Sequence, residues 1–354
     1  MATVLWSVVG TLAGLSAHAI LDRPATLHAV YRGGPGNWPA PWIDADVIFT
    51  ELAALPPLSD IDPAKVALGS RLFHDVSLSA HGQLACASCH NPDHGWTIDR
   101  PTDAGGGRSH RRNPPSLYTA PRLSHWGWDG RGQTLATQTF APLIAPDEMA
   151  NAGIAEVIAR LQRDSRYTGS FAAIYGVGPI TDARLADVLV SFQSSLDNAT
   201  RFDRFMRGDS DALNDSEIDG LHVFRTKGRC ANCHHGALLT DQQFHNLKLS
   251  SFGEASADLG RYGVTGQLDD VGRFRTPSLR HVGTTAPYMH NGLFATLEGV
   301  INLYDRGGGE VWARNAVEAA HPLYAPAAKL SSHIRPLDLS DQEKAALAAF
   351  LRTL

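Results

Sequence analysis

Four stretches of the chain place apolar residues on one side of a helix. They are residues 63–73, 181–192, 216–224 and 340–351. In the second and fourth stretches, Leu and Phe recur at the i, i+3, i+4 and i+7 positions of a helix that packs one face on a core. For the third stretch, Asp215 or Ser216 is the predicted N-cap. The pattern predicts a mainly α fold in which the two halves repeat one arrangement, as after an internal duplication.

The rest of the chain shows little of the alternating pattern of a strand, so we expect little β structure and long loops. Residues 20–60 contain several Pro and Gly and predict an irregular lead-in. The glycines at 105–107 predict a loop rather than a phosphate cradle, because no Lys-Ser/Thr follows them. The polar stretch at 207–211 is the predicted join between two domains, a number that 354 residues accommodate.

Composition excludes several classes of protein. A hydrophobic share of 43% with 19% charged residues is typical of a globular chain rather than a disordered one. The 31 Lys and Arg against 36 Asp and Glu leave a net charge of -5 and no basic stripe, so we expect no nucleic-acid partner. The 4 Cys are too few for a disulfide scaffold, and their positions therefore decide their role.

All four cysteines fall in two copies of one pentapeptide. The copies are Cys86-Ala87-Ser88-Cys89-His90 and Cys230-Ala231-Asn232-Cys233-His234. This is the form of c-type haem attachment, in which two thiols bond the vinyl groups of one porphyrin and the histidine ligates iron. A thioredoxin-like pair needs a strand–turn–helix setting, zinc on four thiolates leaves both histidines unexplained, and two disulfides need an oxidising compartment. We expect two covalent haems c, with His90 and His234 as iron ligands.

Residues 1–19 have the form of a signal peptide. An apolar run from Val4 to Leu15 is followed by Ala17-His18-Ala19, a small-x-small ending, although no Lys or Arg precedes the run. A buried helix or a membrane anchor is the alternative, but the run is shorter than the ~20 residues of a spanning helix. We expect a mature chain with no membrane span. Its location should be periplasmic, since proteins with covalent haem normally mature outside the cytoplasm.

Further motifs follow the two pentapeptides in a fixed order. They read Arg-Asn-Pro-Pro-Ser-Leu at 112–117, Trp-Gly-Trp-Asp-Gly-Arg at 126–131, Pro-Asp-Glu-Met at 146–149, Arg-Phe-Arg-Thr-Pro-Ser-Leu-Arg at 273–280, Thr-Ala-Pro-Tyr-Met-His-Asn-Gly at 285–292 and Asn-Leu-Tyr-Asp-Arg-Gly-Gly at 302–308. The chain from about residue 60 onward resembles the bacterial diheme cytochrome c peroxidase superfamily, and within it the MauG branch. The resemblance implies two cytochrome c-like helical domains. One, at 61–207, holds a peroxidatic haem with an open site, and the other, at 208–354, holds an electron-transfer haem.

The resemblance implies that Tyr304 is the second ligand of the second haem. Plain peroxidases carry Met at this position, whereas the MauG branch carries Tyr. A phenolate is a hard anionic donor that favours oxidised iron, and a thioether favours reduced iron. A core tyrosine on an amphipathic helix is the alternative, and Tyr288, Tyr262 and Tyr324 are the substitutes.

At the first haem, the resemblance implies an open face above the iron that His90 ligates. Glu148 matches the carboxylate that moves a proton between the oxygens of bound peroxide, Gln138 matches its orienting amide, and Pro142 packs between them. A surface helix cap is the alternative role of Glu148. The mobile histidine that blocks this face in plain peroxidases has no counterpart at 105–107, although His110 lies close by.

The resemblance also assigns residues to the region between the haems. Trp128 matches a tryptophan that passes oxidising equivalents from one haem to the other, with an ordinary core role as the alternative. The Asn113 side chain and the carbonyl oxygens of Thr285 and Pro287 match the ligands of a Ca²⁺ ion, which prefers oxygen donors. An ordinary turn residue before Pro114 is the alternative role of Asn113.

The implied function is that of a periplasmic diheme oxidoreductase. Hydrogen peroxide at the first haem builds a high-valent two-haem oxidant, which takes electrons at long range from a protein or another redox donor. MauG draws its electrons through a surface tryptophan just before the second motif, and residues 226–229 here contain none, so we expect a different donor. The alternatives are a conventional cytochrome c peroxidase with a small cytochrome or copper-protein donor, and a non-catalytic diheme electron-transfer cytochrome.

Overall fold

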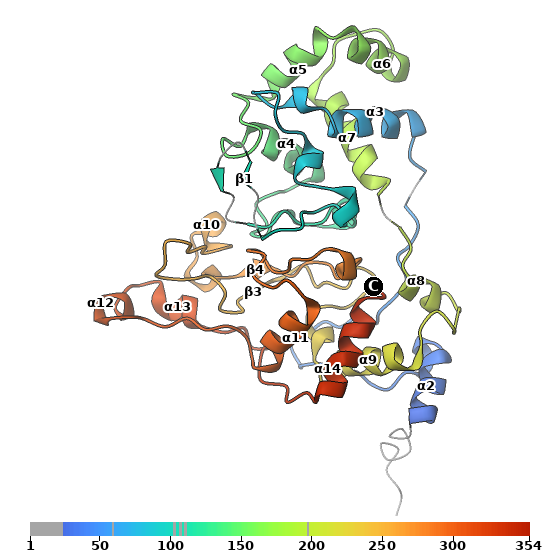
Figure 1. Cartoon of the computed structure of the whole chain (residues 1–354), viewed down its shortest axis with the longest axis vertical. Coiled ribbons are helices and arrows are strands. Elements are labelled where there is room, and N and C mark those ends of the chain that lie inside the picture. Colours follow the sequence, from blue (N-terminus) through green and yellow to red (C-terminus); the bar gives the residue numbers. More distant parts are fainter. Residues whose placement is uncertain (1–23, 59, 102–103, 106–107, 110–111, 197) are drawn as a thin grey trace, which may run out of the picture.

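The computed structural model describes residues 24–58, 60–101, 104–105, 108–109, 112–196 and 198–354. Within these residues the fold is mainly helical, as predicted, and the helices form an upper and a lower lobe that face each other (Figure 1). None of the helices in the described ranges has both the length and the apolar run that crossing a bilayer requires. The predicted signal peptide, glycines 106 and 107, and His110 lie outside the described residues.

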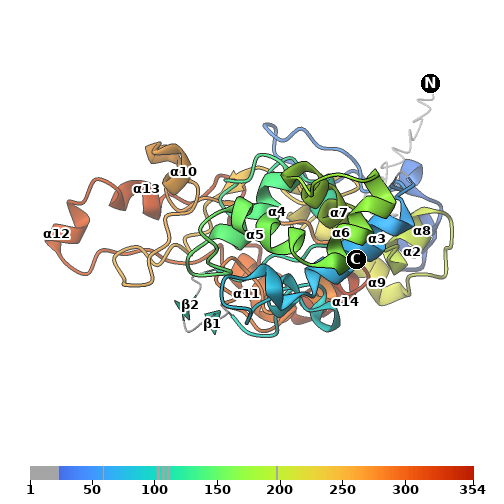
Figure 2. The same ribbon diagram turned by 90° about the horizontal axis from the view of Figure 1, so that it is seen from above.

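The α-helices divide between the two lobes (Figure 1). The upper lobe contains α3 (Pro63–Phe73), α4 (Leu135–Ile144), α5 (Ile154–Gln162), α6 (Ser165–Tyr175) and α7 (Asp182–Ser194). The lower lobe contains α2 (Pro24–Arg32), α8 (Arg201–Met206), α9 (Asp215–Arg225), α11 (Leu297–Asp305) and α14 (Asp341–Leu351). In both ribbon views an arm extends sideways from the lower lobe, and it carries α10 (Tyr262–Thr265), α12 (Ala316–Ala319) and α13 (Tyr324–Ala328) (Figures 1 and 2).

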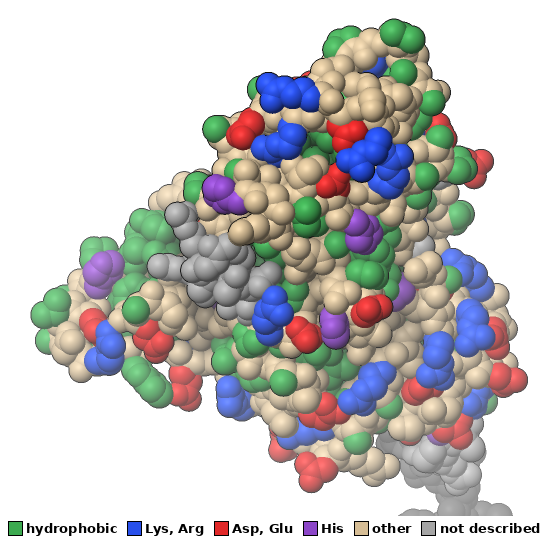
Figure 3. All heavy atoms as spheres, turned by 45° about the horizontal axis from the view of Figure 1, so that its top comes forward, with side chains coloured by type: hydrophobic (Ala, Val, Ile, Leu, Met, Phe, Trp, Pro, Cys, Tyr) green, Lys and Arg blue, Asp and Glu red, His purple; other side chains and the backbone are tan. Residues whose placement is uncertain are grey.

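Short 3-10 helices and two small ribbons complete the described structure. The 3-10 helices are η1 (Pro35–Asn37), η2 (Val76–Leu78), η3 (Cys86–Ser88), η4 (Pro92–His94), η5 (Ala120–Arg122), η6 (Cys230–Asn232), η7 (Leu268–Asp270) and η8 (Val282–Thr284). The antiparallel ribbons pair β1 (Ala104–Gly105) with β2 (Arg108–Ser109), and β3 (Phe244–His245) with β4 (Phe274–Arg275). On the face drawn in Figure 3, basic and acidic side chains are intermixed.

The first and last helices of each half pack together at a glycine. Helix α3 packs on α7, and α9 packs on α14. A Cβ atom on Gly69 of α3 would lie 2.0 Å from the carbonyl oxygen of Val188, and one on Gly220 of α9 would lie 2.0 Å from that of Ala346. The two helix pairs therefore approach closely in the same way, which supports the predicted internal duplication.

These two crossings lead to a prediction about stability. Gly69→Ala and Gly220→Ala should each lower the free energy of unfolding by about 3 kcal/mol, because the added methyl group forces packed helices apart. Gly169→Ala is the matched control, since no atom lies within 4 Å of a Cβ there and alanine favours a helix by about 1 kcal/mol. Urea unfolding followed by circular dichroism measures all three. A Gly69→Ala variant as stable as the parent would contradict the close approach.

The four predicted helices are present, but the one N-cap that the sequence predicted is a different residue. Helix α9 begins at Asp215, and its N-cap is Asn214, whose side chain accepts a hydrogen bond from the Glu217 amide. The Glu217 carboxylate accepts in turn from the Asn214 amide, 2.9 Å away. The prediction of Asp215 or Ser216 was wrong because this reciprocal capping box selects the residue three positions before the glutamate.

The sequence predicted an irregular lead-in at residues 20–60, but part of this segment is helical. Residues 24–32 form α2, and Tyr31 is fully buried in the core of the lower lobe. Trp38 and Leu52 join the same core. The Trp38 indole nitrogen donates to the Tyr31 carbonyl oxygen at 2.8 Å. This segment therefore packs with the second half of the chain, although it precedes the first half in sequence.

The chain passes from the hydrophobic core of the upper lobe to that of the lower lobe before the predicted join at residues 207–208. Leu196 packs with Phe73 and Phe192 of the upper lobe. Phe202 and Phe205 of α8 already belong to the core of the lower lobe. We therefore draw the join between residues 196 and 202 and assign residues 24–52 to the lower lobe.

Candidate functional site

Both pentapeptides fold into the same tight turn. The His90 amide donates to the Cys86 carbonyl oxygen at 3.0 Å, and the His234 amide donates to the Cys230 carbonyl oxygen at 2.8 Å. None of the four thiols forms a disulfide in the described part of the chain. Burial raises the pKa of Cys86 and of Cys230 to about 12, so both thiols are neutral. The turn leaves two thiols and one imidazole close together in each lobe, as haem attachment requires.

A backbone carbonyl orients the imidazole of each motif. His90 Nδ1 lies 2.9 Å from the Trp96 carbonyl oxygen, and His234 Nδ1 lies 3.0 Å from that of Leu239. Because a carbonyl oxygen only accepts, each Nδ1 carries the proton and each Nε2 keeps its lone pair for a metal. Burial lowers the pKa of both rings, that of His234 to about 4, which favours the neutral form that ligates iron.

One cavity connects the second motif with the interface between the lobes. Its lining includes Cys230, Cys233 and His234 of the motif and Leu297, Ile301 and Tyr304 of α11. It continues along interface residues from both halves, among which are Asn113, Trp128, Arg275, Thr285, Pro287 and His290. A mainly apolar cavity with an imidazole in its wall fits the second haem.

Among the candidate tyrosines, Tyr304 alone combines a place in this cavity with an unbonded hydroxyl group. No residue in the described ranges hydrogen-bonds this hydroxyl, and burial, reinforced by nearby Cys233 and Cys230, raises the pKa of Tyr304. Tyr288 also lines the cavity, but its hydroxyl donates to the Val282 carbonyl oxygen at 3.0 Å. Tyr262 and Tyr324 lie in α10 and α13 of the arm. A phenol that has no hydrogen-bond partner among the described residues and shares a cavity with His234 is suited to be the second ligand of the iron.

The three candidates at the first haem lie on α4 and in the turn after it. Gln138 and Pro142 are one helical turn apart on α4, and the Glu148 amide donates to the Ala145 carbonyl oxygen at 3.0 Å. Gln138 Oε1 is buried and has no hydrogen-bond partner among the described residues. The charge of Glu148 is close enough to Cys86 to contribute to the raised pKa of that thiol. An unsatisfied amide oxygen and a carboxylate near the attachment cysteine fit a polar site beside the first haem.

Trp128 forms hydrogen bonds with residues of both halves of the chain. Its indole nitrogen donates to the Asn113 carbonyl oxygen at 2.8 Å, within the first half of the chain. Its own carbonyl oxygen accepts from the Arg275 amide of the second half at 2.7 Å. The indole also lies edge-on to the His290 ring, with 6.4 Å between the ring centres. This position at the lobe interface suits transfer between two haems.

The three candidate calcium ligands line the same cavity at this interface. Asn113 is buried, and its Nδ2 donates to the carbonyl oxygens of Arg100 and Pro101, each at 3.1 Å. Its Oδ1 has only a long contact of 3.4 Å from the Thr97 hydroxyl. The amide is therefore oriented with an oxygen available, and Thr285 and Pro287 bring carbonyl groups from the other half. Such a set of neutral oxygen donors fits Ca²⁺.

An ion-pair network that the sequence did not reveal joins the lobes beside Trp128. Arg112 contacts Asp258 through two hydrogen bonds of 2.6 and 2.8 Å, and Asp129 through one of 2.6 Å. Burial alone would raise the pKa of each carboxyl group, but Arg131 and Arg112 hold the pKa of Asp129 below its usual range, and Arg112 does the same for Asp258. The motif at 112–117 contains Arg112, but its partner Asp258 lies far along the chain, so only the structure shows the contact.

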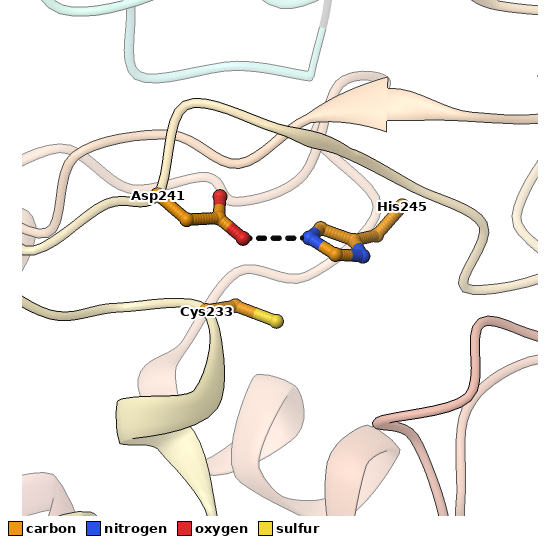
Figure 4. A group of neighbouring side chains, drawn as sticks. All are labelled: Cys233, Asp241 and His245. Atoms are coloured by element: carbon orange, nitrogen blue, oxygen red, sulfur yellow. Dashed lines mark hydrogen bonds and ion pairs between the residues drawn. The ribbon is translucent and has the colours of Figure 1, made fainter. Parts of the chain in front are cut away.

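A second feature beside the second motif offers a different use for Cys233. The ligand atoms of Cys233, Asp241 and His245 lie within 4.8 Å of one another, as a metal site would require. Figure 4 shows the imidazole and the carboxylate bonded, with His245 Nε2 2.8 Å from Asp241 Oδ2, and the thiol below them. In the described ranges no matching group was found at the first motif. Because the whole pentapeptide is repeated and this group is not, haem attachment explains Cys233 better.

Comparison with known proteins gives the same family. The family model for di-haem cytochrome c peroxidase matches residues 63–211. Cytochrome-c peroxidase IdrP1 from Pseudomonas sp. (strain SCT) is 32% identical over 350 residues, which cover 86% of this chain and 87% of that protein. Methylamine utilization protein MauG from Methylorubrum extorquens is 35% identical over 309 residues, covering 84% of this chain and 80% of that protein.

A solved structure agrees with these relatives. A MauG-like protein associated with microbial copper homeostasis superimposes with a TM-score of 0.73 at 32% identity, covering 88% of this chain and 95% of that chain. Membership of the family implies two haems, hydrogen peroxide as oxidant and a redox partner protein. With its helical fold and its long matches to relatives, the chain belongs to the di-haem cytochrome c peroxidase and MauG family and is a peroxide-using oxidoreductase.

Proposed function

We propose that this chain is a MauG-like peroxidase, which reacts with hydrogen peroxide in its fully oxidised form and is then reduced by an external donor. The observation that carries the proposal is the Tyr304 hydroxyl, which is unbonded among the described residues and shares a cavity with His234. An oxygen ligand favours oxidised iron. A second haem with this ligand is suited to giving up an electron rather than to storing one, so no earlier reduction of the enzyme is needed.

In this proposal each motif holds one covalent haem. Cys86 and Cys89 bond the first, Cys230 and Cys233 bond the second, and His90 and His234 ligate the irons through Nε2. When bound, the haems supply the redox chemistry with peroxide and transfer electrons. Asn113, Thr285 and Pro287 bind a Ca²⁺ ion that ties the two halves together at the interface. Removal of residues 1–19 as a signal peptide and a periplasmic location belong to the same proposal.

The residues near the first haem act on the peroxide. Glu148 would take a proton from one oxygen of the peroxide and return it to the other oxygen, which leaves as water, and this transfer lowers the barrier to O–O cleavage. Gln138 orients the peroxide through its amide, and Pro142 packs between the two side chains. Trp128 lies between the lobes, where an oxidisable ring connects the two sites. Each peroxide molecule takes up two electrons and two protons and leaves as two water molecules.

The Tyr304→Met variant tests this proposal. A thioether should replace the phenol as second ligand, raise the reduction potential of the second haem and change its ferric optical and spin-resonance spectra. The oxidised variant should no longer respond to peroxide until it is partly reduced, as expected of a conventional peroxidase. Stopped-flow spectroscopy of the oxidised and half-reduced proteins measures the difference.

Tyr288→Phe is the matched control, because Tyr288 lines the same cavity but its hydroxyl is already bonded. Its spectra should equal those of the parent. If Tyr304→Met leaves the second haem unchanged, Tyr304 is not its ligand. If the parent enzyme responds to peroxide only after partial reduction, it is a conventional peroxidase and the MauG-like proposal is wrong.

A further inference from the structure

Trp42 is held directly against the second attachment motif. It lies in the lead-in between η1 and α3, and its amide donates to the carbonyl oxygen of Arg225, the last residue of α9, at 2.8 Å. Asn232 stands between Cys230 and Cys233 in the motif. Its Nδ2 donates to the Trp42 carbonyl oxygen at 2.9 Å, and its Oδ1 accepts from the Asp44 amide at 2.8 Å. The Trp42 backbone is therefore hydrogen-bonded once to the motif and once to the end of α9, and Asp44 adds a second hydrogen bond to Asn232 of the motif.

The side chain of Trp42 nevertheless faces solvent. It is 50% exposed, whereas Asn232 beneath it is only 2% exposed. The next residue, Ile43, packs against the core of the lower lobe. Asp44 forms an ion pair with Arg229, which immediately precedes the motif. Before Trp42, the Pro39 carbonyl oxygen accepts from the Arg225 guanidinium at 2.8 Å. The segment is thus anchored on both sides of Trp42, while the Trp42 side chain remains exposed.

The loop that binds the Trp42 backbone also lines the cavity of the second haem. Gly228, Arg229, Cys230 and Cys233 all line the cavity from the side of the loop. Electron transfer slows steeply with distance, and an indole is one of the few side chains that gives up an electron readily. Trp42 therefore combines an exposed indole with a backbone that is hydrogen-bonded to the attachment loop, which suits a residue that accepts electrons from an outside donor.

We propose that Trp42 is the residue through which an external one-electron donor reduces the second haem. This inference rests on the proposed function, because peroxide supplies the oxidant. Trp42 gives one electron toward the second haem and regains one electron from the donor, and two such transfers accompany each peroxide molecule. The sequence placed Trp42 in the lead-in and assigned it no chemistry.

The test is to add peroxide to the oxidised holoprotein without any donor. The oxidising equivalents then remain in the protein. Trp42 and one water molecule together should lose two electrons and two protons, which leaves a tryptophan that carries one added oxygen atom. Peptide mass spectrometry detects this product. Trp312 is the matched control, because it is 67% exposed and forms no hydrogen bond with either motif among the described residues. It should stay unmodified.

Two variants at the same position separate redox chemistry from packing. In Trp42→Phe the state that forms after peroxide is added should decay several-fold more slowly than in the parent, because phenylalanine gives up an electron poorly. Trp42→Tyr should restore most of the parent's decay rate. Trp312→Phe should decay like the parent.

If the spectrum changes fully with peroxide but Trp42 stays unmodified, or if Trp42→Phe decays like the parent, this inference is wrong and the proposed function stands. A parent protein that does not respond to peroxide contradicts the proposed function instead.

Discussion

Replacing Glu148 with Gln should slow the reaction with peroxide by about 10²- to 10⁴-fold, the range expected when a general acid–base group is lost. The amide keeps the size of the side chain but neither takes nor returns a proton at the pH of the assay. The charge of this carboxylate contributes to the raised pKa of Cys86, which places Glu148 in the electrostatic surroundings of the first motif. Stopped-flow measurement of the second-order rate constant with peroxide gives the effect, and optical spectra show whether both haems are retained.

The control for this variant is Glu156→Gln on α5 of the same lobe. Glu156 pairs with Arg160 one helical turn away at the surface, so its loss should leave the peroxide reaction unchanged. A Glu148→Gln enzyme with the parent rate constant would mean that Glu148 is a cap rather than the proton carrier. A uniform loss in both variants would point to general damage of the lobe.

The Asp203→Asn variant should lower the free energy of unfolding by about 3–5 kcal/mol, because it breaks a buried ion pair with Arg280. Asp203 and Arg280 are both fully buried, with 2.9 Å between Oδ1 and the guanidinium. The same carboxylate also accepts from the amides of Leu55 and Thr200, each at 2.8 Å. It therefore ties the lead-in to α8 and to the second half of the chain at one point. Urea unfolding at neutral pH measures the loss.

This variant should also change how stability depends on pH. Burial alone would raise the pKa of Asp203, but Arg280 and the backbone amides hold it below its usual value. A carboxyl group with a lowered pKa in the folded state stabilises the fold above about pH 4, and that contribution is lost as the pH falls through the lowered value. The parent should lose stability over this acidic range more steeply than Asp203→Asn.

Asp164→Asn is the control for both measurements. Its partner Arg166 is largely exposed, and exposed pairs contribute at most about 1 kcal/mol. Equal losses in Asp203→Asn and Asp164→Asn would contradict the importance of the buried pair.

The helices of both halves could be predicted because their signals are local. In α7 and α14 the apolar face and the cap, Thr181 or Ser340, lie within one stretch of sequence. The lead-in was predicted less well, since Tyr31 and Trp38 are recognised as core residues only when the second half packs on them. The join was misplaced for a related reason. The polar residues at 207–211 marked a surface turn, whereas Phe202 and Phe205 had already changed lobes.

The sequence by itself determined the family, the two repeated motifs and a short set of candidate residues for each site, because Cys-x-x-Cys-His is a local chemical signature. The tertiary structure decided which members of that set meet. Tyr304 and Tyr288 line one cavity, and only the bond from Tyr288 to Val282 separates a structural phenol from an available ligand. Trp42 reaches the second motif through Asn232, although 187 residues lie between Trp42 and the first cysteine of that motif, Cys230. Contacts across such a separation depend on how two lobes pack, and no pattern in one stretch of sequence contains that information.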